Sequence, residues 1–93
     1  MQFMILSRRR TEDHPPSDFD ALIPDETNRI RELYAAGIVR QIWHRTDIPG
    51  ACFLLESEDQ EAAQAIIDSL PMASSGLSEF TIHPLAPYRG FAN

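Results

Sequence analysis

The chain has 93 residues, of which 43% are hydrophobic and 24% charged, the balance of one soluble globular domain. Fourteen acidic residues against eight basic ones give a net charge of -6, which disfavours nucleic acids and anionic membranes as partners. All eight basic residues are arginine, so Schiff-base and lysine general-base chemistry are excluded.

Cysteine and histidine usage points to a cytoplasmic protein without a zinc site. The single cysteine, Cys52, lies in an apolar run, which predicts an inert thiol in a reducing cytoplasm. His14, His44 and His83 are too widely spaced for a zinc signature. The dispersed glycines form no phosphate-binding loop, and no apolar stretch reaches the roughly 18 residues of a membrane span.

Runs of β-forming residues predict four strands, at residues 2–7, 38–45, 51–55 and 77–83. The second and third of these form a hairpin, because a Pro-Gly turn signal at residues 49–50 separates them.

Apolar residues at helical spacing predict two helices. The first runs from Phe19 to about Gly37, and Pro24 is expected to kink it or to delay its regular part. The second is expected to be capped by Ser57 in a capping box with Gln60 and to end at Pro71. The resulting order is βαββαβ, a ferredoxin-like α+β domain over residues 1–84 with a four-stranded antiparallel sheet and both helices on one face.

Strands one and three are apolar at successive positions, residues 3–6 and 52–55, so both faces of the sheet are apolar. Two helices cover only one face, which leaves roughly 300 Å² of apolar sheet in projection. At about 25 cal/mol per Å², burying that face contributes roughly 8 kcal/mol per subunit. We therefore expect a homodimer, or a larger homo-oligomer of dimers, in which the sheet faces a second copy.

The last residues, 85–93, are predicted to form an extended arm, because Pro84 and Pro87 restrict the backbone around them. Tyr88 and Phe91 on this arm have little to pack on within the domain. They are expected to anchor the arm on a neighbouring subunit.

Five residues in the middle of the chain resemble a known family: Gly37 at a helix end, Arg40 and Trp43 on the next strand, and Leu70 and Pro71 closing the second helix. This Arg-x-x-Trp strand between a Gly-ended and a Leu-Pro-ended helix is similar to the muconolactone isomerase family. The resemblance implies a dimeric α/β barrel and higher assemblies of those dimers. It also implies a cofactor-independent isomerisation of a small carboxylated lactone in aromatic-compound catabolism.

The chain departs from that family at its first strand. The enzymes are lysine-bearing along and just after this strand, whereas this chain has Met4 and three arginines at residues 8–10. Arginine holds a carboxylate but does not shuttle protons at neutral pH. A dimeric barrel that binds a ligand without catalysis therefore remains an alternative, and a cofactor-free monooxygenase is a weaker one.

Three residues are candidates for moving protons. Glu26 falls on the apolar stripe of the first helix, where burial would raise its pKa. If Pro24 breaks the phase of the helix, Glu26 turns to water instead. His44 and His83 each end a predicted strand at a rim of the sheet, where imidazoles titrate near neutral pH or act as ordinary hydrogen-bonded side chains.

Three further residues are candidates for holding a small anionic organic ligand. Arg40 lies within an apolar strand and either grips a ligand carboxylate or pairs with Glu56 or Glu79 on neighbouring strands. Trp43 offers a flat surface to an unsaturated ring or serves as a core or interface residue. Arg8 begins a basic run that either attracts anions or forms a solvated edge.

Overall fold

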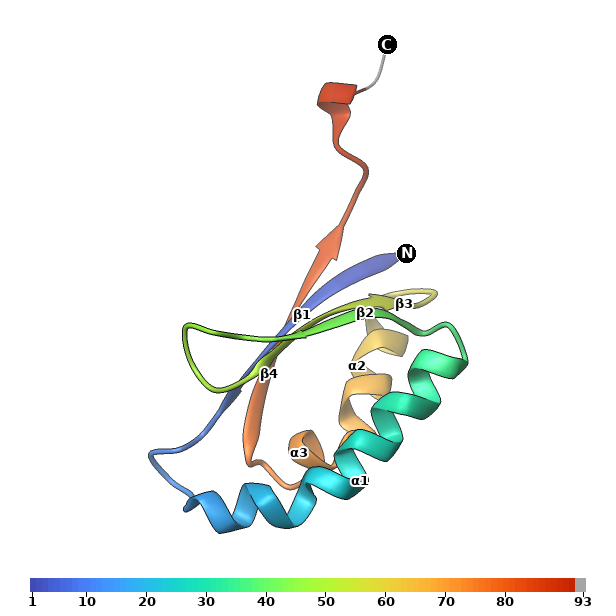
Figure 1. Ribbon diagram of the computed structural model, residues 1–93. Helices are drawn as coiled ribbons and strands as arrows, with labels where there is room; N and C mark the ends of the chain where they lie inside the picture. Colours follow the sequence, from blue (N-terminus) through green and yellow to red (C-terminus); the bar gives the residue numbers. More distant parts are fainter. Residues whose placement is uncertain (92–93) are drawn as a thin grey trace.

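A computed structural model describes residues 1–91 as one antiparallel sheet with helices packed on one of its faces (Figure 1). The strand order is β2-β3-β1-β4, which confirms the predicted ferredoxin-like α+β fold. The elements in chain order are β1 (Gln2–Arg9), α1 (Pro16–Ala35), β2 (Val39–His44), β3 (Ala51–Glu56), α2 (Gln60–Asp68), α3 (Pro71–Ser74), β4 (Ser78–Leu85) and a 3₁₀ turn η1 (Arg89–Phe91).

The central strand β1 extends two residues beyond its predicted end at Ser7. Arg8 lies opposite Glu79 of β4, and Arg9 lies opposite Ser78, so both arginines belong to the ladder rather than to a loop. The cross-strand partners supplied by β4 extend the strand through this basic run. The fourth strand likewise runs on to Leu85 instead of ending at residue 83.

Helix α1 begins earlier than predicted and continues through Pro24. Pro16 occupies the first helical turn, where proline needs no hydrogen-bond partner for its missing N–H. Pro24 leaves the carbonyl of Asp20 without its helical partner, and both residues lie on the exposed side of the helix, where water reaches that carbonyl. The expectation that Pro24 delays the regular part of the helix is therefore wrong.

The second helical segment differs from its prediction at both ends. Asp59, not Ser57, caps α2, and its side chain accepts the backbone N–H of Ala62 at 2.8 Å. The hydroxyl of Ser57 instead donates to the carbonyl of Asp59. Pro71 opens the short helix α3, because proline fits a first helical turn as readily as it ends one.

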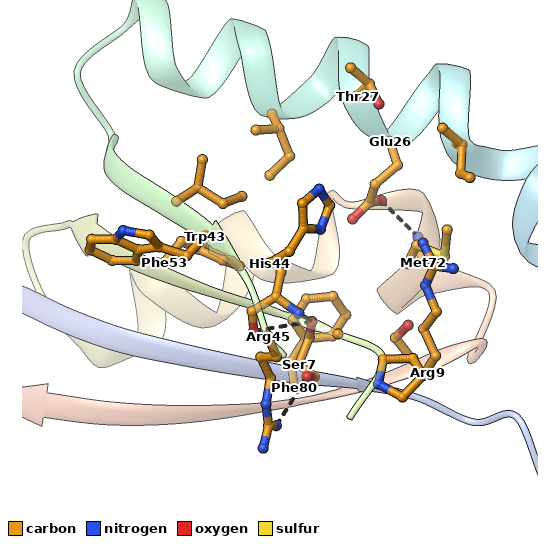
Figure 2. Close-up of a pocket in the computed structure, with 17 residues that line it drawn as sticks. Ser7, Arg9, Glu26, Thr27, Trp43, His44, Arg45, Phe53, Met72 and Phe80 are labelled. Carbon is orange, nitrogen blue, oxygen red and sulfur yellow. Dashed lines mark hydrogen bonds between the residues drawn. The ribbon is translucent and has the colours of Figure 1, made fainter. Parts of the chain in front are cut away.

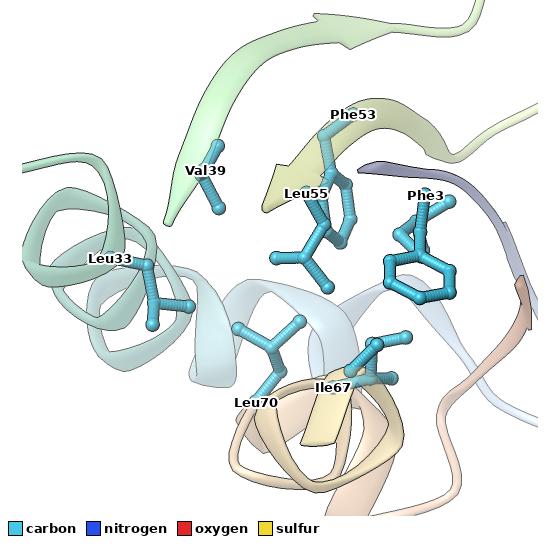
Figure 3. Close-up of a cluster of buried hydrophobic side chains, with 9 residues drawn as sticks. Phe3, Leu33, Val39, Phe53, Leu55, Ile67 and Leu70 are labelled. Atoms are coloured by element: carbon cyan, nitrogen blue, oxygen red, sulfur yellow. The ribbon is translucent and has the colours of Figure 1, made fainter. Parts of the chain in front are cut away.

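The hydrophobic core lies between the sheet and the two long helices (Figure 3). Phe3 of β1, Leu55 of β3 and Leu33 of α1 are buried in one cluster, and Ile67 and Leu70 close the core from the α2 side. Burial of each such side chain stabilises the fold by about 1.5–3 kcal/mol, so the core fixes both helices on the same face.

No helix formed by residues 1–91 covers the other face of the sheet. Residues opposite each other in the ladder share a face, so Met4 lies beside Leu54 and Leu6 beside Cys52. All four side chains are half-buried, and the Cys52 sulfur lies 3.3 Å from that of Met4. This apolar surface, formed by Met4, Leu6, Cys52 and Leu54, is called the open face below.

The chain beyond β4 leaves the body of the domain (Figure 1). Residues 89–91 form a 3₁₀ turn where an extended segment was expected. Tyr88 and Phe91 pack edge to face with their ring centroids 4.9 Å apart, yet they are 72% and 87% exposed. Among residues 1–91, no helix combines the length and the apolar composition needed to cross a membrane.

Candidate functional site

A cleft of about 760 Å³ lies between α1 and the helix-bearing face of the sheet (Figure 2). Most of its wall is apolar. The apolar side chains that line it include Ile23, Ile30, Ile42, Phe53, Met72 and Phe80. The polar side chains on its wall include Ser7, Arg9, Glu26, Thr27, His44 and Ser78. An apolar enclosure with a few convergent polar groups is the usual form of a site for a small organic molecule.

Glu26 enters the cleft from the middle of α1. Its side chain is half-buried and accepts the backbone N–H of Met72 at 3.0 Å. Burial raises the pKa of this carboxyl, while the Met72 hydrogen bond and the positive charge of Arg9 oppose that rise. Glu26 therefore lies on the cleft side of the helix, and the alternative in which Pro24 turns it to water is excluded.

His44 enters the same cleft from the opposite wall. It is the last residue of β2 and pairs with Ala51, two positions before the buried Phe53, so its side chain leaves the sheet on the helix side. Figure 2 shows the imidazole of His44 rising toward α1, while the carboxylate of Glu26 descends from that helix. The fold thus places a carboxylate and an imidazole, the latter on an exposed residue, on the walls of one cleft.

Arg9 is a third charged side chain in the cleft. It follows Phe3, Ile5 and Ser7 at every second position of β1, which places it on the helix side of the sheet. Its guanidinium lies over the ring of Phe19, 5.4 Å from the centroid. Within residues 1–91, no carboxylate oxygen lies within 4.0 Å of it.

Arg45 fixes the hairpin that carries His44. Its guanidinium binds Asp47 through two hydrogen bonds of 3.1 and 2.8 Å and donates to the carbonyl of Ser7 at 3.3 Å. The ion pair lowers the pKa of Asp47 to about 2. A Cβ on Gly50 would overlap the same Ser7 carbonyl, so only glycine lets the turn approach β1 this closely.

The sequence-predicted candidates Arg8 and His83 lie on the open-face side of the sheet. Arg8 binds Glu79 at 2.9 Å and Glu12 at 2.8 Å, which occupies its guanidinium. His83 lies opposite Met4, and its Nε2 is 3.1 Å from the hydroxyl of Thr81. Neither side chain lines the cleft.

Arg40 also lies outside the cleft, at the irregularity in β2 between Val39 and Gln41, and is exposed. The structural alternative for Arg40, a pair with Glu56 or Glu79, is wrong. Glu56 binds the terminal amine of Met1 at 3.4 Å, and Glu79 binds Arg8.

Trp43 lies on β2, the edge strand, on the same side of the sheet as Cys52 of the open face. It pairs with Cys52, is 49% exposed and contributes to the rim of the cleft. This exposure excludes Trp43 from the core of the single chain. Its flat indole is available either to a ligand at the rim or to a neighbouring subunit.

Comparison with protein families shows which family the chain belongs to. The family model for muconolactone delta-isomerase matches residues 1–90. The chain belongs to the muconolactone delta-isomerase family. A comparison of this family member with curated proteins finds no match.

Among solved structures, this family member is similar to 5-chloro-2-hydroxyhydroquinone dehydrochlorinase from Burkholderia phenoliruptrix AC1100, in complex with 2,5-dihydroxybenzoquinone. The match covers 97% of this chain and 98% of the other, with a TM-score of 0.70 and 14% sequence identity. At this identity the likeness establishes a common fold.

Of the candidates predicted from the sequence, Glu26, His44 and Trp43 line the cleft of this family member, and Arg9 lines it without having been a candidate. A signal for Arg9 was present, since it shares the two-residue period of the buried Phe3 and Ile5. That period did not show which face of β1 is covered by the helices, because the intervening positions of β1 are apolar as well.

Proposed function

We propose that this protein is a cofactor-independent isomerase that moves the double bond of a small unsaturated lactone carboxylate in aromatic-compound catabolism. One observation supports this most: Glu26, a carboxyl with a raised pKa, shares a largely apolar cleft with His44 in a member of the muconolactone delta-isomerase family. A base whose pKa is raised toward neutral pH is suited to remove a carbon-bound proton. The similar dehydrochlorinase, which is named for a chlorinated hydroxyhydroquinone, also supports aromatic catabolism.

In the proposed mechanism, the conjugated carbonyl of the lactone acidifies the proton on its γ-carbon. The Glu26 carboxylate takes this proton, and the electron pair of the C–H bond moves into the ring to form a dienolate. Protonated His44 then donates a proton to the α-carbon, which forms the new C–H bond and leaves the double bond between the β- and γ-carbons. Solvent returns the proton from Glu26 to His44, so atoms and charges balance without a cofactor.

The apolar wall has its own part in this mechanism. Side chains such as Phe53 and Phe80 exclude water from the ring, which strengthens the electrostatic interactions of the carboxylate and imidazole. The Met72 amide holds Glu26 in one orientation before the substrate arrives. These contacts position the base and protect the dienolate from bulk water.

The proposal includes a second copy of the chain on the open face. The half-buried Met4, Leu6, Cys52 and Leu54 form a continuous apolar surface with no helix over it. Two such faces packed together, as in the barrel expected from the sequence, would remove this surface from water. We place the assembled protein in the cytoplasm, in keeping with its free Cys52.

The arm at residues 86–91 supports an assembly of more than one chain. Tyr88 and Phe91 are largely exposed, and the segment that carries them runs away from the body of the domain (Figure 1). Aromatic side chains of this kind are typical anchors of protein interfaces. We propose that the arm packs on a neighbouring subunit.

A binding module without catalysis is the second candidate. The observation in its favour is the hydrogen bond from the Met72 amide to Glu26. Through this bond Glu26, a residue of α1, stabilises the first turn of α3 independently of any reaction. In that case the cleft binds an unsaturated acid and releases it unchanged.

Incubation of the purified protein with muconolactone, followed by ultraviolet absorbance and NMR of the product, separates the two candidates. We expect conversion to the isomeric enol-lactone in the wild type and its loss in Glu26→Gln. No turnover above the buffer rate would contradict the isomerase assignment for this substrate. Binding of unchanged muconolactone, detected by chemical-shift changes of cleft residues, would then favour the binding module.

A further inference from the structure

We propose that Arg9 is the residue that binds the anionic group of the ligand, and that the cleft selects small unsaturated rings carrying one ionised oxygen group over their neutral analogues. Arg9 lies in the cleft of the proposed function, and the proposal rests on that function only in taking this cleft as the ligand site. It assigns the positioning role to Arg9 in place of Arg8 and Arg40, which lie outside the cleft.

The placement of Arg9 is fixed by the ladder between β1 and β4. Its backbone lies opposite Ser78, and its N–H donates to the carbonyl of Pro49 at 3.0 Å. The side chain leaves the sheet on the helix side and rises along the wall toward Glu26 and Met72 (Figure 2). Stacking over Phe19 at 5.4 Å holds the guanidinium without using its N–H donors.

The donors of Arg9 are available to a ligand. Arg8, Arg29 and Arg45 each bind a carboxylate of this chain within 4.0 Å. Arg9 has no such partner within residues 1–91, although it is half-buried and a desolvated cation without a counter-charge is costly. A ligand carboxylate would supply that counter-charge through two parallel hydrogen bonds.

The cleft needs a cation if it admits an anion, because Glu26 already brings a negative charge to it. Arg9 lies close enough to Glu26 to lower the pKa of that carboxyl, yet no N–O separation between the two falls within 4.0 Å. The guanidinium therefore offsets the repulsion between the ligand anion and Glu26 and still leaves its donors accessible. Ser78, directly across the ladder from Arg9, adds a hydroxyl to the same end of the cleft.

Two probes of one shape test the selectivity: phenylacetate, which is ionised, and phenylacetamide, which is neutral. Dissociation constants are measured by chemical-shift titration of the full-length protein. We expect wild type to prefer phenylacetate, and Arg9→Gln to weaken phenylacetate binding about 10- to 100-fold while leaving phenylacetamide unchanged. Arg9→Lys should recover part of the preference, because the charge remains but the two-pronged geometry is lost.

The matched control is Arg40→Gln, which removes the same charge from an exposed position outside the cleft. It should leave both dissociation constants unchanged. If Arg9→Gln unfolds, Arg9→Met keeps the apolar stem over Phe19 and tests the same loss of charge.

Equal binding of the two probes to wild type, binding of neither, or equal loss in the Arg9 and Arg40 variants would overturn the assignment. Because the readout is binding, it stands apart from the turnover assay. Failure to isomerise muconolactone with the Arg9 effect intact would refute the proposed function alone. Where turnover is found, Arg9→Gln should raise KM more than it lowers kcat, which a purely structural role would not do.

Discussion

The carboxylate of Glu26 accepts the backbone N–H of Met72 at 3.0 Å, and this bond joins the middle of α1 to the first turn of α3. α3 is only four residues long, and its N-cap, Leu70, has no side-chain acceptor to offer. Glu26 satisfies one of the amides that a helix start leaves free. The same carboxylate faces the cleft, so it serves the fold and the proposed chemistry together.

These two roles of Glu26 are separable by substitution. Glu26→Gln keeps an oxygen that accepts the Met72 amide but removes the base, so we expect kcat to fall by about 10²- to 10⁴-fold at unchanged melting temperature. Glu26→Ala removes the acceptor as well and should lower the free energy of unfolding by about 1 kcal/mol. Steady-state kinetics with muconolactone and thermal denaturation measure the two effects. Full turnover in Glu26→Gln would exclude Glu26 as the base.

The pH dependence of turnover should report the raised pKa of Glu26. A base acts when ionised, so kcat/KM should fall as pH decreases through this pKa, above the ordinary range of a glutamate. Arg9 lowers that pKa, and Arg9→Gln should therefore move the acidic limb to higher pH. The pH profile of kcat/KM, measured for wild type and for Arg9→Gln, tests the direction of this shift. An acidic limb that stays in place, or moves to lower pH, would argue against electrostatic contact between the two residues.

His44 is expected to return the proton. In His44→Gln the first proton transfer to Glu26 remains possible, whereas delivery to the α-carbon is slowed. In deuterated water, NMR should show deuterium entering the γ-position of muconolactone faster than product forms. In wild type, product formation should keep pace with exchange. Loss of exchange and turnover in equal measure would indicate that His44 acts before or during the first step.

Leu54 lies on the open face, opposite Met4 in the ladder, and tests the proposed contact between sheets. Leu54→Glu would bury an unpaired charge in that contact, at a cost of about 3–5 kcal/mol, and should shift the protein toward monomer. Ala65→Glu introduces the same charge on the exposed side of α2 and is the control. Analytical ultracentrifugation gives the masses. Identical masses for both variants and wild type would contradict packing through the open face.

The arm is tested by deleting residues 86–93. Since Tyr88 and Phe91 are 72% and 87% exposed, their loss should cost little within one domain but weaken contacts between subunits. We expect a smaller sedimentation coefficient for the truncated protein and for the double variant Tyr88→Ser/Phe91→Ser. Unchanged sedimentation of both would place the arm outside the assembly.

Local patterns in the sequence determined the βαββαβ order and hence the ferredoxin-like sheet. They also singled out Glu26 and His44, which the structure places on the wall of the cleft, because a helical stripe and a strand end are readable without tertiary contacts. They failed at Pro24 and Pro71, where proline fits inside or at the start of a helix as well as after one.

Only the tertiary structure decided which arginine enters the cleft. Both faces of β1 are apolar, so its two-residue period cannot say which face the helices cover. Pairing with β4 places Arg8 against Glu79 on the uncovered side and Arg9 against Ser78 beneath α1. Arg8 and Arg9 are adjacent in sequence, yet Arg8 forms an ion pair on one face and Arg9 lines a ligand-sized cleft on the other. The reason is that contacts between distant segments set the strand register.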